Sequence, residues 1–266
     1  MPVCKSKILA QNFINRSSLA DSLLNMTSIG PDDIVYEIGP GTGMLTKELA
    51  VRAGKVIAIE KDPDLYMSLV QKFGHNDNVI LHSADFLRFK IKDMYYKIVA
   101  NLPFNITSAI VRKIVYATNP PVEAYLIMQK EAAEKFTGMP RTTQFSVLVK
   151  PWFRLRIMKY FKRTDFSPVP SVDVVMLHIT KRSPPLVANK DRFRYERFVT
   201  HGFNSWKKNV KQNYKNMFTY TQWKRLSRDL AFPVHAKPSE LRFSHWLGLY
   251  EFYRMNVNRS SLQFTH

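Results

Sequence analysis

The chain has 266 residues and a mass of 31.0 kDa, with 45% hydrophobic and 23% charged residues. This composition excludes an intrinsically disordered, low-complexity or collagen-like protein, and the single cysteine, Cys4, excludes a disulfide framework or a cysteine-based zinc cluster. A net charge of +19 favours a polyanionic partner, either nucleic acid or an acidic membrane surface, over a merely solubilising surface. No apolar run approaches the ~20 residues of a membrane span. Without a signal peptide either, the expected location is the cytoplasm.

Apolar runs alternate with amphipathic stretches through the first half of the chain. Short β-branched runs separated by helical stretches are typical of an α/β fold with a doubly wound, mostly parallel sheet. The predicted strands are 34–38, 56–59, 79–81, 97–100 and 124–128, and the predicted helices are 45–53, 64–73 and 106–117.

The second part of the chain has a different pattern and a higher charge density. Residues 1–180 carry 23 basic and 16 acidic side chains, whereas residues 181–266 carry 17 basic and 5 acidic ones. Helical spacing predicts helices at 195–206 and 239–253, after a proline-containing linker at 181–189. We therefore predict a catalytic domain over residues 1–182 and a small, basic, all-helical domain over 183–266.

A glycine-rich loop follows the first predicted strand. Glu37-Ile-Gly-Pro-Gly-Thr-Gly43 connects this strand to a helix, so the backbone can approach a ligand closely beside the N–H groups of the helix N-terminus. Glu60 ends the next strand, 21 residues after Gly39, where an acid can accept both ribose hydroxyls of NAD or S-adenosylmethionine (SAM). The alternative for Glu60 is a surface acid at a strand end.

Two later motifs favour SAM over NAD. Asp85 and Phe86 follow the third strand, where they could bind the amino edge and the face of an adenine. The tetrapeptide Asn101-Leu-Pro-Phe104 follows the fourth strand, and a dehydrogenase has no use for it there. A methyltransferase that acts on an amino group can use this tetrapeptide at that position.

The tetrapeptide suits methylation of the exocyclic nitrogen of adenine, which is a poor nucleophile. The side-chain carbonyl of Asn101 and the backbone carbonyl of Leu102 can accept its two N–H groups and stabilise the cation formed after attack. Pro103 fixes the backbone, and Phe104 can stack on the extruded base at roughly 1–3 kcal/mol. The alternative is a turn with a buried Asn and a core Phe.

Several motifs together resemble the ribosomal RNA adenine-N6 dimethyltransferases, the superfamily that joins the Erm enzymes of 23S rRNA to the KsgA-like enzymes of small-subunit rRNA. The resemblance implies a Rossmann-like SAM-dependent methyltransferase fold with a helical C-terminal domain. It extends from about Lys7 to Tyr253. The motifs are Asn12-Phe-Ile14, Glu37–Gly43, Glu60, Asp85, Asn101–Phe104 with Asn105-Ile-Thr107, and Phe166-Ser-Pro-Val-Pro-Ser-Val172.

The resemblance implies a role for each matching residue. Phe166 closes over the target adenine opposite Phe104. At position 104 many relatives have Tyr, so any role of a phenolic hydroxyl is lost in this chain. Glu60 takes the ribose and Asp85 the adenine amino group of SAM, while Asn101 lies between cofactor and base. The implied cofactor-binding residues are Asn12, Ile14, Gly39, Gly41, Glu60, Asp85 and Asn101.

The start Gln11-Asn12-Phe13 is similar to that of Erm proteins, since KsgA-like enzymes more often have His at the second position. The stretch 148–152 and the basic composition are also Erm-like. The Erm branch implies methylation of an adenine in the peptide exit tunnel and resistance to macrolides, lincosamides and streptogramin B. The alternatives are a KsgA-like enzyme of the small subunit, a noncatalytic nucleic-acid-binding relative and a small-molecule methyltransferase.

A base inside folded RNA must be turned out into the pocket, so the enzyme needs contacts with the surrounding backbone. No histidine has metal-ligand spacing, and we expect no metal and a monomer. Trp152, Trp206, Trp223 and Trp246 either stack on bases or belong to the core. The RNA-binding candidates are Lys150, Arg154, Arg156, Lys159, Lys162 and Arg163, followed by Lys207, Lys208, Lys211, Lys215, Lys224, Arg225 and Arg228.

Overall fold

The structure is a computed structural model that describes residues 12–203 and 209–256. The chain divides into two compact units, a sheet unit of residues 1–133 with 153–181, and a helical unit of residues 134–152 with 182–266. The division near residue 182 lies beside the predicted boundary, but residues 134–152 group with the C-terminal helices instead of the sheet. In the helical unit the Tyr195 hydroxyl donates to the Val147 carbonyl over 2.9 Å, and the rings of Trp152 and Tyr195 meet edge to face.

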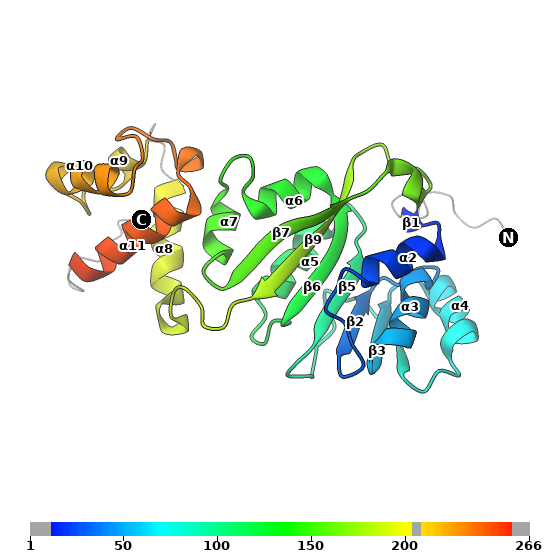
Figure 1. The fold of residues 1–266 in the computed structure, drawn as a ribbon. Helices are drawn as coiled ribbons and strands as arrows, with labels where there is room; N and C mark the ends of the chain where they lie inside the picture. The colour runs from blue at the N-terminus through cyan, green and yellow to red at the C-terminus, as the bar shows by residue number, and fades with distance from the viewer. Residues whose placement is uncertain (1–11, 204–208, 257–266) are drawn as a thin grey trace. The chain divides into compact units, whose positions relative to one another are not determined.

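The sheet unit is built on a seven-stranded sheet in the order β4-β3-β2-β5-β6-β9-β7 (Figure 1). The first five strands in this order are parallel, and β9 and β7 are antiparallel to their neighbours. The predicted α/β fold with a mostly parallel sheet is confirmed, and all five predicted strands are present. The strands are β2 (Ile34–Ile38), β3 (Lys55–Glu60), β4 (Val79–Ser83), β5 (Lys97–Asn101), β6 (Glu123–Gln129), β7 (Phe153–Tyr160) and β9 (Val174–Lys181).

The two antiparallel strands were not predicted from the sequence. β7 is an edge strand in which exposed Arg154 and Arg156 alternate with Phe153 and Leu155, so its apolar signal is only half as dense as that of a central strand. Because of its cations, the segment is also typical of an RNA-binding stretch, and the strand was not predicted. β9, by contrast, is buried from Val174 to Ile179 because it pairs on both sides.

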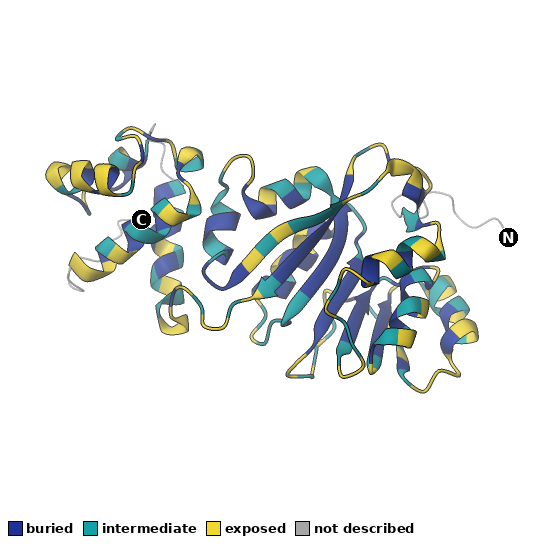
Figure 2. Ribbon diagram, viewed as in Figure 1, coloured by how far each residue is buried: buried dark blue, intermediate teal, exposed yellow. Residues whose placement is uncertain are grey.

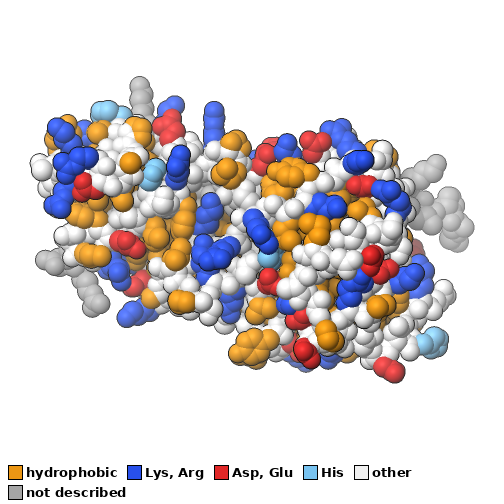
Figure 3. Space-filling view, viewed as in Figure 1, with side chains coloured by type: hydrophobic (Ala, Val, Ile, Leu, Met, Phe, Trp, Pro, Cys, Tyr) orange, Lys and Arg blue, Asp and Glu red, His pale blue; other side chains and the backbone are white. Residues whose placement is uncertain are grey.

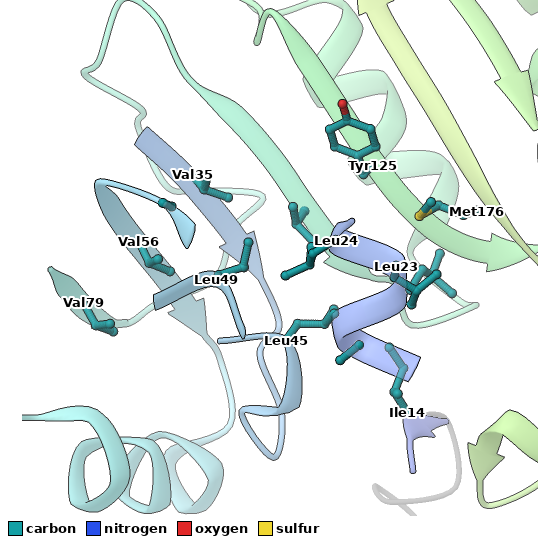
Figure 4. Close-up of a cluster of buried hydrophobic side chains, with 14 of the residues drawn as sticks. Ile14, Leu23, Leu24, Val35, Leu45, Leu49, Val56, Val79, Tyr125 and Met176 are labelled. Atoms are coloured by element: carbon teal, nitrogen blue, oxygen red, sulfur yellow. The ribbon is translucent and has the colours of Figure 1, made fainter. Parts of the chain in front are cut away.

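Helices cover both faces of the sheet. Alternate residues of a strand point to opposite faces, so Val35 enters the core beneath α2 (Ser17–Leu24) and α3 (Met44–Arg52), while Tyr36 meets Phe89 and Tyr96 on the other face. Figure 4 shows Leu23, Leu24, Leu45 and Leu49 of these helices packed toward the strands. Figure 2 shows the central strands buried along nearly their whole length, as two covered faces require.

Local signals explain where the other helices of this unit begin. α4 (Pro63–Phe73) starts at an N-cap, Asp62, whose carboxylate accepts from the Asp64 and Leu65 N–H groups at 2.9 and 3.2 Å. α5 (Thr107–Val115) buries Ile110, Val111 and Ile114 along one stripe. A two-stranded sheet pairs β1 (Phe13–Ile14) with β8 (Phe166–Ser167), which follows the 3-10 turn Arg163–Asp165.

The helical unit has a core made largely of aromatic rings. Phe198 stacks on Tyr214 with ring centroids 4.6 Å apart and on Tyr253 at 5.0 Å, and Trp223 donates its indole N–H to the Val234 carbonyl over 2.9 Å. Large rings bury much area per residue, which suits short helices. The helices are α7 (Gln144–Val149), α8 (Arg192–Phe203), α9 (Val210–Asn213), α10 (Tyr220–Asp229) and α11 (Phe243–Asn256), while α6 (Lys130–Thr137) crosses the division between the units.

The predicted C-terminal helices differ from the observed ones at their ends. α11 begins at Phe243 rather than at Ser239, because Pro238–Glu240 forms a separate 3-10 turn in which the Glu240 carboxylate accepts from the Lys237 N–H. α8 begins at Arg192, and the described part of this helix ends at Phe203. Over residues 12–203 and 209–256, no helix combines the length and the apolar character of a membrane span.

Candidate active site

The sheet order places the end of β2 next to the end of β5. The chain runs from β2 outward through β3 and β4 and then returns to the other side of β2 as β5, which makes the β2–β5 pair a topological switch point. Ligands of open α/β sheets bind at the carboxyl ends of the strands at such a point. The register pairs Ile38 with Ala100, so the glycine-rich loop and Asn101 leave the same edge side by side.

The glycine-rich loop forms one wall of two adjoining cavities at this edge, which share Gly39 and Pro103 and together make one elongated cavity. Gly39, Gly41 and Gly43 all have positive φ, at +64°, +60° and +85°, a conformation that L side chains rarely adopt. A Cβ on Gly39 would meet no atom within 4 Å, whereas one on Gly41 would collide with the ring of Phe13. The open space beside Gly39 lies in the cavity and is available to a ligand.

Glu60 presents a fixed carboxylate at the end of β3. Its side chain is only 3% exposed, and its Oε2 accepts from the Gly41 N–H at 3.1 Å. Its Oε1 accepts from the N–H groups of Lys61 and Asp62, both at 2.8 Å. Three backbone donors therefore hold this carboxylate beside the glycine loop, which argues against the simple surface acid that the sequence left open.

Asp85 and an apolar slot lie at one end of the cavity. Lys61 donates to Asp85 over 2.8 Å, and this hydrogen bond, with one from the Leu87 N–H, lowers the pKa of the carboxyl below its usual value. Asp85 is thus an ionised acceptor at neutral pH. Phe86 is buried beneath it with Lys113 over its ring, and the slot is completed by Ile59, Pro103, Ile106 and Ile110.

The tetrapeptide Asn101–Phe104 lies at the other end. Asn101 lines the cavity together with Asn12 and Pro103, and its Nδ2 donates to the Asn12 carbonyl over 2.6 Å. The Leu102 N–H donates to the Ile127 carbonyl over 2.9 Å, which anchors this turn to β6. Phe104 is half-buried and packs against the hydrophobic core on one side.

The second predicted aromatic has a different environment. Phe166 is 1% exposed, and Phe161 meets its ring edge to face at a centroid distance of 5.3 Å. The ring is therefore covered in this structure, where it belongs to the hydrophobic core, and its stacking on a target base stays a prediction. Ile14 is likewise buried, pairs with Phe166 across the two-stranded sheet and lines the cavity.

Glu37 is the first residue of the glycine-rich motif, but the sequence assigned it no role of its own. It lines the cavity, is 1% exposed, and accepts from the Thr46 hydroxyl at 2.7 Å through Oε2, while its Oε1 is buried without a hydrogen-bond partner. Burial, with the nearby charge of Glu60, raises the pKa of Glu37 to about 8. An acid inside the otherwise apolar strand Ile34–Ile38 was the available signal, since such a strand is buried on both faces.

The predicted RNA-binding cations fall into both units. Arg154, Arg156 and Lys159 are on β7, and the exposed Lys162 and Arg163 follow it in the sheet unit. In the helical unit Lys150 is half-buried, and burial lowers its pKa. Lys211 and Lys215 belong to this unit too, and Lys207 and Lys208 lie outside the described residues.

A group of exposed cations in the helical unit is on α10. Figure 3 shows Lys and Arg side chains gathered over this helix. Lys224, Arg225 and Arg228 are exposed and line a hollow with Thr221 and Pro233. The buried Trp152, Trp223 and Trp246 belong to the core rather than to a stacking surface, and Trp206 and Cys4 lie outside the described residues.

The part of the chain that the structure describes brings together no three His, Cys, Asp or Glu side chains that could hold a metal ion. The chemical character of the cavity is instead that of a slot for an elongated, partly charged molecule. One end offers an ionised acceptor in apolar surroundings, the middle offers the fixed Glu60 carboxylate and an open glycine, and the other end offers Glu37 and two asparagines.

Sequence comparisons give one consistent family. The family model described as ribosomal RNA adenine dimethylase matches residues 4–246. Two relatives named ribosomal RNA small subunit methyltransferase A are similar to this chain. That of Moorella thermoacetica is 33% identical over 220 residues, 77% of this chain and 76% of the relative. That of Streptococcus agalactiae is 30% identical over 246 residues, 88% of this chain and 85% of the relative.

Solved structures show the same architecture. The 23S rRNA methyltransferase ErmE matches with a TM-score of 0.85 and 30% identity, over 91% of this chain and 100% of the other. A dimethyladenosine transferase from Plasmodium falciparum matches with a TM-score of 0.73 over 91% of this chain and 98% of the other, and at 21% identity this likeness concerns the fold alone. The family match spans every residue that lines the cavity.

Proposed function

The chain belongs to the ribosomal RNA adenine dimethylase family and is a SAM-dependent rRNA adenine methyltransferase, and we propose that its target is the N6 amino group of an adenine in 23S rRNA. The observation that carries the site assignment is the meeting of the glycine loop and Asn101 at the β2–β5 edge. The function that follows is methylation of the macrolide site, with resistance to macrolides, lincosamides and streptogramin B.

The residues of the cavity fit SAM from end to end. We assign the adenine to the apolar slot, with its amino group donating to Asp85, and the ribose hydroxyls to Glu60. Gly39 leaves room for the cofactor, since a side chain there would enter the same space. The unpartnered oxygen of Glu37 suits the ammonium group of the methionine part, near Asn12.

Bound SAM supplies an electrophilic methyl group on its sulfonium. The protein holds the target nitrogen in line with that methyl, through the side-chain oxygen of Asn101 and the carbonyl of Leu102, which accept its two N–H groups. Phe104 stacks on the flipped base. The methylated nitrogen then loses its extra proton to water, so no dedicated base is required.

Binding of the RNA backbone falls to the cations of β7, of its following turn and of the helical unit. Arg154, Lys162, Lys211 and Lys224 are examples from each segment. Phosphate contacts dominate nucleic-acid affinity and fix the orientation of the substrate without reading its sequence. We propose that these cations hold the RNA while the cavity selects the base.

Two observations support different rRNA targets. The structural match to ErmE, over all of that chain, and the start Gln11-Asn12-Phe13 support 23S rRNA. The names of the sequence relatives support the alternative, a small-subunit rRNA adenine in ribosome biogenesis. We favour 23S rRNA because the ErmE match has 30% identity, equal to that of the Streptococcus agalactiae relative, over 91% of this chain, a larger share than either of the two relatives covers.

A methylation assay with two substrates tests this choice. The protein is incubated with methyl-labelled SAM and either protein-free 23S rRNA or small ribosomal subunits, and the modified base is mapped by primer extension. Label at a macrolide-site adenine of 23S rRNA is expected, and its absence with Asn101→Ala is the control for the site. Label in the small subunit alone would overturn the 23S proposal, and label in neither would overturn both targets.

A cellular assay tests the consequence of the same proposal. Expression of the protein in a susceptible bacterium should raise the macrolide concentration that stops growth, whereas the Asn101→Ala variant should not. An unchanged concentration with methylated 23S rRNA present would separate the modification from resistance and contradict only the latter.

A further inference from the structure

The segment between residues 12 and 16 is held by a second stretch of chain that is distant in sequence. Phe13 and Ile14 pair with Ser167 and Phe166 in the antiparallel β1–β8 sheet. Beyond this pairing the Asn15 N–H donates to the Asp165 carbonyl over 3.2 Å, and Asn15 Nδ2 donates to the Thr164 carbonyl over 2.8 Å. A short segment is therefore fixed by backbone and side-chain bonds along its whole length.

Asp165 is the anchor of this arrangement. Its side chain is buried, with 8% exposed, and each carboxylate oxygen has a donor. Oδ1 accepts from the guanidinium of Arg16, and Oδ2 accepts from the Lys162 N–H at 3.0 Å. The carboxylate thus ties the N-terminal segment to the 3-10 turn before β8, and neither Arg16 nor Asp165 lines the cavity.

The other end of the held segment contacts the predicted catalytic asparagine. The Asn12 carbonyl accepts from Asn101 Nδ2 at 2.6 Å. The carboxamide of Asn is planar, so using its nitrogen here leaves its oxygen on the opposite arm, free to accept. A flip of the amide would bring two oxygens together at Asn12 and break the hydrogen bond, and Asp at position 101 would meet the same repulsion.

We propose that Arg16 and Asp165 are positioning residues for methyl transfer, which act by holding the Asn12 carbonyl where it fixes the Asn101 amide with its oxygen toward the target amino group. This inference rests on the proposed role of Asn101. It gives the β1–β8 pair a function beyond packing. It also gives a physical reason for an amide rather than a carboxylate at position 101.

The first test compares two ion pairs of the sheet unit. Asp165→Asn weakens the pair with Arg16, and Asp21→Asn weakens the pair of Asp21 with Arg52, which joins α2 to α3 away from Asn101. Rates are divided by the number of SAM-binding sites in each preparation, so that misfolded protein does not count. Asp165→Asn should lower kcat about tenfold because a small misplacement of a reacting group is costly. The KM for RNA, and kcat of Asp21→Asn, should stay within about twofold.

The second test observes the Asn101 amide directly and needs no activity. Its two Nδ2 proton resonances are assigned by their loss in Asn101→Ala. They should shift or broaden in Asp165→Asn, more weakly in Arg16→Gln because Arg16 is largely exposed, and remain in place in Asp21→Asn. Unchanged resonances or an unchanged kcat in folded Asp165→Asn would overturn the proposal. If Asn101→Ala itself kept full activity, the proposed role of Asn101 would fail instead.

Discussion

The two units of this protein use their residues in different ways. The sheet unit concentrates its chemistry at one edge, where Gly39, Glu60 and Asn101 meet because three strands end side by side. The helical unit has an aromatic core, with its cations spread over several helices, among them α8, α9 and α10. A site built from a few fixed atoms is sensitive to single substitutions, whereas a charged surface distributes binding over many weak contacts. The contrast predicts that single substitutions have larger effects in the cavity of the sheet unit than on the charged surface of the helical unit.

The largest effect is expected at Asn101, where the comparison predicts that one side chain carries the reaction. Asn101→Ala removes an acceptor of the target amino group and should lower kcat roughly 10²- to 10³-fold. RNA affinity should change little, since most of it comes from phosphate contacts made elsewhere. Single-turnover methylation and RNA binding by filter retention measure the two quantities. A rate close to that of the wild type would remove Asn101 from the chemistry.

A second strong effect is expected in the glycine loop. Gly39→Ala places a methyl group in the cofactor space at a φ of +64°, a strain of roughly 1–2 kcal/mol for an L residue. SAM affinity, measured by calorimetry, should fall roughly tenfold, equivalent to about 1.4 kcal/mol. The matched control is Gly30→Ala, because a Cβ there also meets nothing within 4 Å but its φ lies outside the left-handed region. Equal SAM affinity in both variants would contradict the cofactor placement.

A smaller effect, on RNA affinity, is expected from a substitution on α10, and it sharpens the comparison with the sheet unit. Lys224→Glu should weaken RNA binding and reduce the slope of log affinity against log salt by about 1, with SAM affinity unchanged. Lys47→Glu on α3 is the matched control, a charge reversal at another exposed lysine, on a helix with no predicted RNA contact. A parallel loss in both variants would mean that net charge alone decides RNA binding.

The smallest effect concerns the stability of the sheet unit without cofactor. Burial raises the folded pKa of Glu37 to about 8 from its ordinary value of 4.5, so the folded state binds more protons than the unfolded state between these pH values. Stability should therefore decrease as pH rises through this window. Glu37→Gln cannot titrate and should flatten the decrease, as thermal unfolding at pH 6 and pH 9 would show. An identical pH dependence in both proteins would mean that Glu37 is ionised throughout.

Much of the sheet unit was predictable because its signals are local. The five parallel strands are apolar runs, and Asp62-Pro63 is a typical helix start, with an N-cap followed by a proline, at the beginning of α4. Edge strand β7 was not predicted, because its exposed arginines alternate with apolar residues in a pattern that is also typical of an RNA-binding stretch. The start of α11 was wrong by one turn because the capping pattern at Ser239 and Glu240 belongs to a 3-10 turn.

The sequence by itself determined the fold class, the family and the residue types of the site, because strand periodicity and short motifs are local properties. Only the tertiary structure decided which of these residues meet. It buried Glu37 with an unpartnered oxygen, covered Phe166 with Phe161, and joined Asn101 to the Asn12 carbonyl across 89 positions of sequence. Hydrogen-bond partners and ring contacts depend on what the rest of the chain brings to a residue, and no local pattern contains that information.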